Sequence, residues 1–199
     1  KLCRPLQRAR MVTVGEYGGE ALDAYETMAT HYPSHWKPTP AKDADTLWGN
    51  VQVKKSDAKQ IAGFRGGTPR NLGQYIDASQ NYQADILSEV TKGWRLSSRG
   101  IAGYFQFHFI DVMPANWPKS IVSHDLRPKN AYYEMAQVNQ PVSPLPRFVD
   151  CGSAMELWVA NDLSRSFDQC RIRWRVRHAD KTLAMGEQTV NVSACDAVL

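Results

Sequence analysis

The chain has 199 residues, of which 43% are hydrophobic and 22% charged, and its formal net charge is +4. This composition is that of a globular protein with one or two domains, and it excludes a disordered or fibrous chain. The lysines and arginines are scattered and no apolar run approaches membrane-spanning length, so neither nucleic acid nor a membrane is an expected partner. Nothing in the sequence demands a metal ion or another cofactor, and it leaves open whether the chain forms a homo-oligomer.

The stretch Ala9–Gly19 predicts a short, mostly apolar strand that ends on Glu16 and is broken at once by glycines. In α/β proteins the carboxyl ends of parallel strands carry the catalytic groups, and a glutamate is seldom buried unless it is paired or functional. Glu16 is therefore the first candidate for a catalytic residue. The alternative is a carboxylate that only ends a strand in an ordinary turn.

A helix is predicted over residues 20–30, with Leu22, Tyr25 and Met28 spaced for one buried face. His31 and His35 have the spacing of paired metal ligands. Because Pro33 breaks the helix that such a pair needs, we interpret them as loop or surface histidines.

The next stretch, residues 37–71, is rich in proline, glycine and charge and contains Trp48. A loop of this length is usually functional or disordered. We favour an active-site loop because it follows the strand that carries Glu16. A disordered surface excursion is the alternative.

The best helix prediction covers residues 72–97, where apolar residues recur at three- and four-residue steps and form one stripe. They are Leu72, Tyr75, Ile76, Tyr82, Ile86, Val90 and Trp94.

An almost wholly apolar strand, residues 100–109, follows; this is typical of a parallel strand buried on both faces. Asp111 comes after it, then a loop with Trp117 and a helix opened by Pro128 that runs through Tyr132, Met135 and Val138. This alternation of strands and helices predicts a parallel sheet.

From residue 139 the pattern changes. Pro141, Pro144 and Pro146 predict a stiff connector. Short strands are then predicted at residues 155–159, 170–177 and 189–192. In the second of these, four arginines alternate with apolar residues, which indicates a half-buried antiparallel strand with a solvated basic face. They are Arg171, Arg173, Arg175 and Arg177, and binding of an anionic ligand is the alternative interpretation.

The four cysteines, Cys3, Cys151, Cys170 and Cys195, lack metal-ligand spacing. Free thiols are favoured over a Cys151–Cys170 disulfide. The triplet Asn191-Val192-Ser193 is a glycosylation sequon, which matters only in a secretory host.

Several of these stretches resemble glycoside hydrolase family 2, the β-galactosidase and β-mannosidase type of enzyme. They are Val14–Gly18, Ser79–Gln83, Gly103–Asp111, Arg127–Tyr133 and Leu157–Asp162. The resemblance implies that residues 1–139 are the C-terminal portion, the last two βα units, of a (β/α)8 TIM barrel. It implies that residues 140–199 are the first portion of an immunoglobulin-like antiparallel β-sandwich. Because two strands cannot close a barrel, we expect the upstream barrel portion of the same enzyme as a partner.

The resemblance also assigns roles. It makes Glu16 the nucleophile of a retaining glycosidase that cleaves terminal β-linked sugars from oligo- or polysaccharides in a β-galactosidase-like reaction. The residues expected to bind the carbohydrate are Tyr17, Trp48, Phe107, His108, Asp111 and Trp117. The alternative roles are a satisfied core histidine for His108 and a packing residue between the two domains for Trp117.

Two departures from the family pattern stand out. The family carries its acid/base glutamate after an asparagine, and the chain contains no Asn-Glu dipeptide, so the chain alone is expected to be inactive. Ile110 also stands where the family often has asparagine. This favours the alternative function, a non-catalytic carbohydrate-binding or structural module.

Overall fold

The computed structural model describes residues 12–34, 72–97, 101–115, 118–149 and 152–199. The chain divides into a βα unit (residues 13–91 and 103–138) and a β unit (residues 1–12, 92–102 and 139–199). It is a mixed α/β structure with small parallel and antiparallel sheets. Its elements, in chain order, are β1 (Val12–Tyr17), α1 (Tyr25–His31), α3 (Leu72–Leu96), β2 (Ile101–Gln106), α4 (Asn130–Val138), β3 (Val142–Val149), β4 (Ala154–Asn161), β5 (Phe167–His178), β6 (Lys181–Val192) and β7 (Asp196–Val198).

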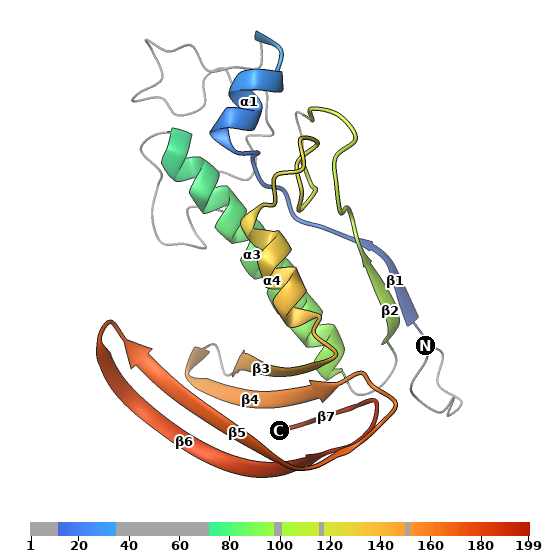
Figure 1. Ribbon diagram of the computed structural model, residues 1–199, viewed down its shortest axis with the longest axis vertical. Helices are drawn as coiled ribbons and strands as arrows, with labels where there is room; N and C mark the ends of the chain where they lie inside the picture. The colour runs from blue at the N-terminus through green and yellow to red at the C-terminus, as the bar shows by residue number, and fades with distance from the viewer. Residues whose placement is uncertain (1–11, 35–71, 98–100, 116–117, 150–151) are drawn as a thin grey trace. The chain divides into compact units, whose positions relative to one another are not determined.

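In the βα unit, β1 and β2 pair in a two-stranded sheet and run in the same direction (Figure 1). Helices α3 and α4 lie side by side, as a hydrogen bond between Asn81 and Asn130 shows. An apolar cluster joins the segment after β1 to the first turns of α3; it consists of Leu22, Met28, Tyr32, Tyr75 and Ile76. None of the described helices has the length and hydropathy needed to cross a membrane.

Helix α1 begins five residues later than predicted, and Tyr25 is 58% exposed rather than buried. The reason lies in the backbone before it, whose polar groups bind distant parts of the chain. The Leu22 N–H donates to Ser79 Oγ (3.0 Å), and the Leu22 carbonyl accepts from Gln80 Nε2 (3.0 Å). The Leu22 N–H and carbonyl are thus satisfied by residues of α3 without a helical turn.

Helix α3 has the predicted extent, and Tyr75 and Ile76 are buried as expected. The predicted stripe is wrong at Val90, which is 36% exposed. Polar side chains occupy much of the buried face as well. Ser79, Gln83, Thr91 and Arg95 are spaced at multiples of four residues, with Leu87 at the remaining step of the row, and Ser88 is also buried. Because residues four apart lie on one side of a helix, this polar row and the apolar cluster share the covered side of α3.

Strand β2 was expected to be buried on both faces, and this is wrong for the described chain. Phe105 is 62% exposed, Phe107 43% and Phe109 58%. Tyr104 lies on the opposite face from Phe105, because successive side chains alternate, and its ring packs edge-on against Tyr17. The described residues therefore cover one face of this sheet and leave the other open.

The β unit contains a three-stranded sheet in the order β3-β4-β7 and a two-stranded sheet of β5 and β6, all antiparallel. The predicted proline connector is wrong, since Pro144 and Pro146 lie within β3, opposite Val159 and Leu157. Strand β3 is at the edge of its sheet, the position where proline is tolerated because its missing N–H can face away from the ladder.

The remaining predicted strands are confirmed within β4, β5 and β6. All four arginines of β5 are exposed, as expected of a solvated basic face. Neither Cys170 nor Cys195 forms a disulfide within the described residues, while Cys3 and Cys151 lie outside them. Two buried polar groups hold the β unit together. Asn161 Nδ2 donates to the carbonyls of Arg165 (2.8 Å) and Ser193 (2.9 Å), and Arg95 pairs with Asp162 (2.8 Å).

A buried ion pair lies at the centre of the βα unit. Lys129 Nζ is 2.9 Å from Asp23 Oδ1, and the side chain of each residue is 1% exposed. Ser123 Oγ (3.1 Å) and the Tyr32 hydroxyl (3.1 Å) also donate to the Asp23 carboxylate, and Lys129 Nζ donates to the Ala21 carbonyl (3.1 Å). Burial, followed by the negative charge of Asp23, raises the pKa of Tyr32 far above its ordinary value.

We predict that Lys129→Met lowers the free energy of unfolding by about 3–5 kcal/mol, because it leaves the Asp23 carboxylate buried without its counter-charge. Urea denaturation of the chain measures this loss. The matched control is Arg173→Met, which breaks an exposed ion pair with Glu187 and is expected to cost less than about 1 kcal/mol. Equal losses in the two variants would contradict the importance of the buried pair.

Candidate active site

The candidate site lies where β1 and β2 end side by side. The Phe107 N–H donates to the Tyr17 carbonyl at 2.7 Å, and the peptide bond between Phe107 and His108 is cis. Gly18 follows Tyr17, and a Cβ atom at this position would overlap the Phe107 carbonyl oxygen. Glycine is therefore required here for the close approach of two backbones.

Tyr17 faces the helices. Its hydroxyl makes a 2.7 Å hydrogen bond with Thr91 Oγ1 on α3, and its ring centroid lies 6.1 Å from that of Tyr104. Burial raises the pKa of the Tyr17 phenol. Since side chains alternate along a strand, Glu16 points to the opposite face of the sheet, the face that no described helix covers.

Glu16 is exposed, and within the described part of the chain no hydrogen bond or ion pair holds its carboxylate. The side chain of Phe105 is on the open face as well, because it alternates with Tyr104 on β2, and Phe107, the residue after β2, is 43% exposed. Lys119 Nζ lies 5.7 Å from the centre of the Phe107 ring. The open face thus presents a carboxylate beside aromatic rings, an arrangement that suits stacking of a sugar ring next to a reactive carboxylate.

A short chain of hydrogen bonds orders the loop after β2. His108 Nε2 is 2.7 Å from Asp111 Oδ1, and Ser120 Oγ donates to Asp111 Oδ2 at 2.5 Å. Asp111 is buried, whereas the His108 side chain is 32% exposed and packs edge-on against Phe107. Asp111 thus fixes the orientation of His108 and ties it to Ser120.

Gln83 on α3 ties both strand-end loops together. Its Nε2 lies within hydrogen-bond distance of the carbonyls of Gly19 (2.7 Å), Lys119 (3.1 Å) and Ser120 (3.1 Å), and its side chain is fully buried. Gly19 belongs to the segment after Glu16, and Lys119 and Ser120 to the segment after Phe107. One amide therefore sets the spacing between the two halves of the site.

The structure brings together five of the seven predicted site residues, Glu16, Tyr17, Phe107, His108 and Asp111. Trp48 and Trp117 lie outside the described residues. Sequence reasoning missed the anchoring role of Gln83 and Ser120. The polar residues spaced by four within the apolar helix 72–97 were the pattern that could have revealed Gln83.

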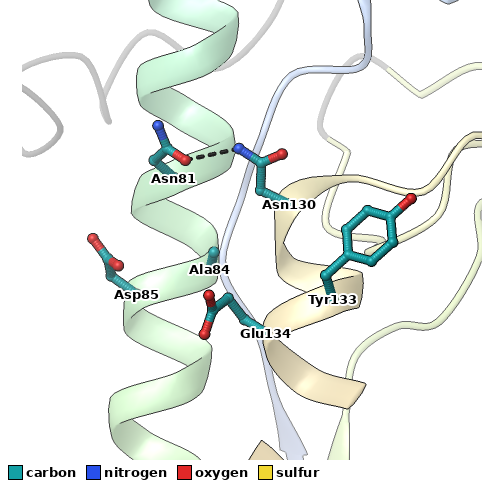
Figure 2. A pocket seen from close by; sticks show the side chains of 6 residues that line it. All are labelled: Asn81, Ala84, Asp85, Asn130, Tyr133 and Glu134. Atoms are coloured by element: carbon teal, nitrogen blue, oxygen red, sulfur yellow. Dashed lines mark hydrogen bonds between the residues drawn. The ribbon is translucent and has the colours of Figure 1, made fainter. Parts of the chain in front are cut away.

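A separate hollow of about 250 Å³ lies between α3 and α4, and its walls are mainly polar (Figure 2). Its lining residues are Asn81, Ala84, Asp85, Asn130, Tyr133 and Glu134. Asn130 Nδ2 donates to Asn81 Oδ1 (2.7 Å) across it. None of the predicted site residues lines this hollow.

No group of three or more histidine, cysteine, aspartate or glutamate side chains that could hold a metal ion occurs among the described residues. His31 packs edge-on against His124, with ring centroids 4.6 Å apart, and His35 is outside the described part.

Neither a protein-family model nor a curated protein matches this chain. Solved structures do. A β-D-mannosidase from Dictyoglomus thermophilum matches with a TM-score of 0.65 and 17% identity, over 94% of this chain and 23% of the mannosidase. The exo-chitosanase CsxA of Amycolatopsis orientalis matches with a TM-score of 0.57 and 17% identity, over 79% of this chain and 20% of CsxA. A complex of a CsxA variant with PNP-beta-D-glucosamine gives a TM-score of 0.61 at 14% identity, over 98% and 24%.

The chain thus spans about a fifth to a quarter of the length of these structures. Its fold is similar to part of solved glycosidases, which agrees with the resemblance of its motifs to glycoside hydrolase family 2. The β-galactosidase part of that expectation receives no support from these structures.

We predict that Gly18→Ala destabilises the chain by about 1–3 kcal/mol, because the added methyl group forces the ends of β1 and β2 apart. Gly15→Ala is the matched control: it lies on the same strand, and a Cβ there meets nothing within 4 Å. Urea denaturation of both variants is the measurement. A similar effect of the two substitutions would show that the close approach at Gly18 is not a constraint.

We predict that Gln83→Met, which keeps the size of the side chain, costs about 2–4 kcal/mol, since it leaves buried carbonyls in both loops without their donor. Gln137→Met on the exposed face of α4 is the control and is expected to change stability by less than about 0.5 kcal/mol. Hydrogen exchange localises the effect, with faster exchange in residues 18–23 and 118–123. Unchanged exchange in these two segments would contradict the role of Gln83 in holding them.

Proposed function

We propose that the chain is part of a retaining β-glycosidase of glycoside hydrolase family 2, with Glu16 as its nucleophile. In this proposal, residues 1–139 are the last two βα units of the catalytic barrel and residues 140–199 begin an immunoglobulin-like sandwich. The observation that carries it is the position of Glu16. It is the last residue but one of β1, on the face opposite α3, exposed and on the same open face of the sheet as Phe105 of β2.

A barrel explains why this face is open. In a (β/α)8 barrel the helices cover the outside of the sheet and the strands enclose the inside. The contacts of Tyr17 with α3 identify the covered side as the outside, so Glu16 and Phe107 would face inward at the carboxyl end of the strands. The partner we propose for this face is the upstream barrel portion of the same enzyme.

The chemistry needs a second carboxyl group. In retaining glycosidases one carboxylate attacks the anomeric carbon and forms a glycosyl-enzyme, and a carboxyl group about 5–5.5 Å away protonates the leaving oxygen. The second group then activates the water that releases the sugar. We assign this acid/base to the upstream portion, because Asn-Glu does not occur in this chain.

The remaining residues have supporting roles in this proposal. Phe107 provides a stacking surface for the sugar ring, and His108, oriented by Asp111, contacts its hydroxyl groups. Tyr17 supports Glu16 from the covered face, because its own hydroxyl binds Thr91. Trp48 and Trp117 remain candidates for contacts with more distant sugar units.

The test is hydrolysis of a panel of aryl β-glycosides, including β-mannoside, β-glucosaminide, β-galactoside and β-glucoside, by the chain alone and together with its upstream barrel portion. We predict turnover only in the combined preparation. Glu16→Gln should lower it by about a thousandfold or more, because the amide cannot form the glycosyl-enzyme.

The matched control is Glu26→Gln on α1, which removes an exposed carboxylate whose contact with Arg127 is long, at 3.7 Å. It is expected to keep full activity. Turnover by the chain alone would mean that the acid/base lies within these residues. A lack of turnover in every preparation would contradict the catalytic role.

A second function, carbohydrate binding without cleavage, is favoured by Ile110, which replaces an asparagine often found in the family. The exposed aromatic rings on and after β2 suit such binding. Binding of a glycan by the combined preparation, with no hydrolysis and no effect of Glu16→Gln, is the result that would support it.

A further inference from the structure

The exposed face of the β5–β6 hairpin carries an unusual row of cations. The register of β5 with β6 is continuous from Cys170 to Val176 and shifts between Val176 and Arg177, where β6 contributes one extra residue. The arginines occupy alternate positions of β5, and alternate residues of a strand lie on one face. We define the arginine face by four β5 residues and the β6 residues directly opposite them. They are Arg171, Arg173, Arg175 and Arg177, with Thr189, Glu187, Met185 and Thr182.

The charge on this face is poorly compensated. Glu187 accepts from Arg173 Nε at 2.7 Å and lies 3.7 Å from Arg171 Nε. It is the one acidic residue of the face. Arg175 and Arg177 are exposed and have no hydrogen bond or ion pair with any described residue. One carboxylate thus faces four guanidinium groups, and the uncompensated charge is concentrated toward the end of the hairpin.

The geometry of the row suits a linear polyanion. Side chains on one face of a strand repeat every two residues, about 6.6–6.8 Å, so the row extends over about 20 Å. The planar guanidinium fork binds carboxylate and sulfate groups through two parallel hydrogen bonds. The face includes no aromatic side chain on which the bases of a nucleic acid could stack.

We propose that the arginine face binds an anionic polysaccharide, a sugar polymer that carries carboxylates or sulfates, at a surface formed entirely by residues of the β unit. Its function would be to hold a polymeric substrate on the enzyme. The choice of a polysaccharide as the polyanion rests on the proposed glycosidase function, whereas the preference for anions rests on the face itself.

The experiment measures binding of the full chain to polygalacturonate and to heparin by calorimetry at low salt, with neutral dextran as the blank. We expect binding to both polyanions, none to dextran, and at least about a tenfold loss of affinity between 50 and 500 mM salt. The double substitution Arg175→Gln with Arg177→Gln is expected to weaken binding at least about tenfold. Glu187→Gln should strengthen it, because it frees Arg171 and Arg173.

The matched control is the double substitution Arg127→Gln with Arg147→Gln, which removes the same charge from exposed positions elsewhere. It is expected to leave the affinity within about twofold. An equal loss in the control would show that net charge alone drives binding and would overturn the proposal. So would tighter binding of duplex DNA than of either polysaccharide, or no binding to either polyanion. Because no turnover is needed, this result and the Glu16 test can fail independently.

Discussion

The arrangement of the candidate site depends on one buried amide. Gln83 reaches from α3 to carbonyls in the segments that follow both β1 and β2; the second of these segments carries His108, Asp111 and Ser120, and the first directly follows Glu16 and Tyr17. Separating either loop from α3 would leave a buried carbonyl without its hydrogen-bond donor, which costs free energy. Gln83 therefore favours one fixed arrangement of the two loops and the helix. Ser79 and Gln80 extend the same tie to the backbone of Leu22. Three side chains of the Ser79–Gln83 motif, all on α3, therefore hold the backbone of the two loops by hydrogen bonds.

With the loops fixed, strand alternation decides what each side chain can do. The Tyr17 hydroxyl bonds to Thr91 on α3, so this face of β1 is turned toward the helices. Because successive side chains alternate, Glu16 lies on the opposite face. The close approach at Gly18 brings the Phe107 backbone against the end of β1, and the buried pair of Lys129 and Asp23 joins the segment after β1 to the start of α4. The position of the carboxylate thus follows from packing on the opposite side of the sheet.

Local patterns predicted most elements but not how they are covered. The extent of α3, the alternation in β5 and a strand that ends within one residue of Glu16 could be predicted from the sequence. The start of α1 could not, because the backbone of Leu22, within the predicted helix, is satisfied by Ser79 and Gln80, more than fifty residues away, without a helical turn. Pro144 and Pro146 suggested a connector, since nothing local reveals that β3 is an edge strand. The open face of β2 could not be predicted for a related reason. An apolar run shows that a strand can be buried, but only the tertiary structure shows whether one or both faces of that strand are covered.

The central claim, that Glu16 is a catalytic nucleophile, is tested most directly by covalent trapping. A 2-deoxy-2-fluoro glycoside with a good leaving group slows release of the glycosyl-enzyme, so the sugar stays attached to the residue that attacked it. The chain, combined with its upstream barrel portion, would be treated with such reagents and analysed by peptide mass spectrometry. The account predicts one glycosyl group on Glu16 and none in the Glu16→Gln variant. A label on another carboxylate, or a preparation that hydrolyses glycosides without ever being labelled at Glu16, would contradict it.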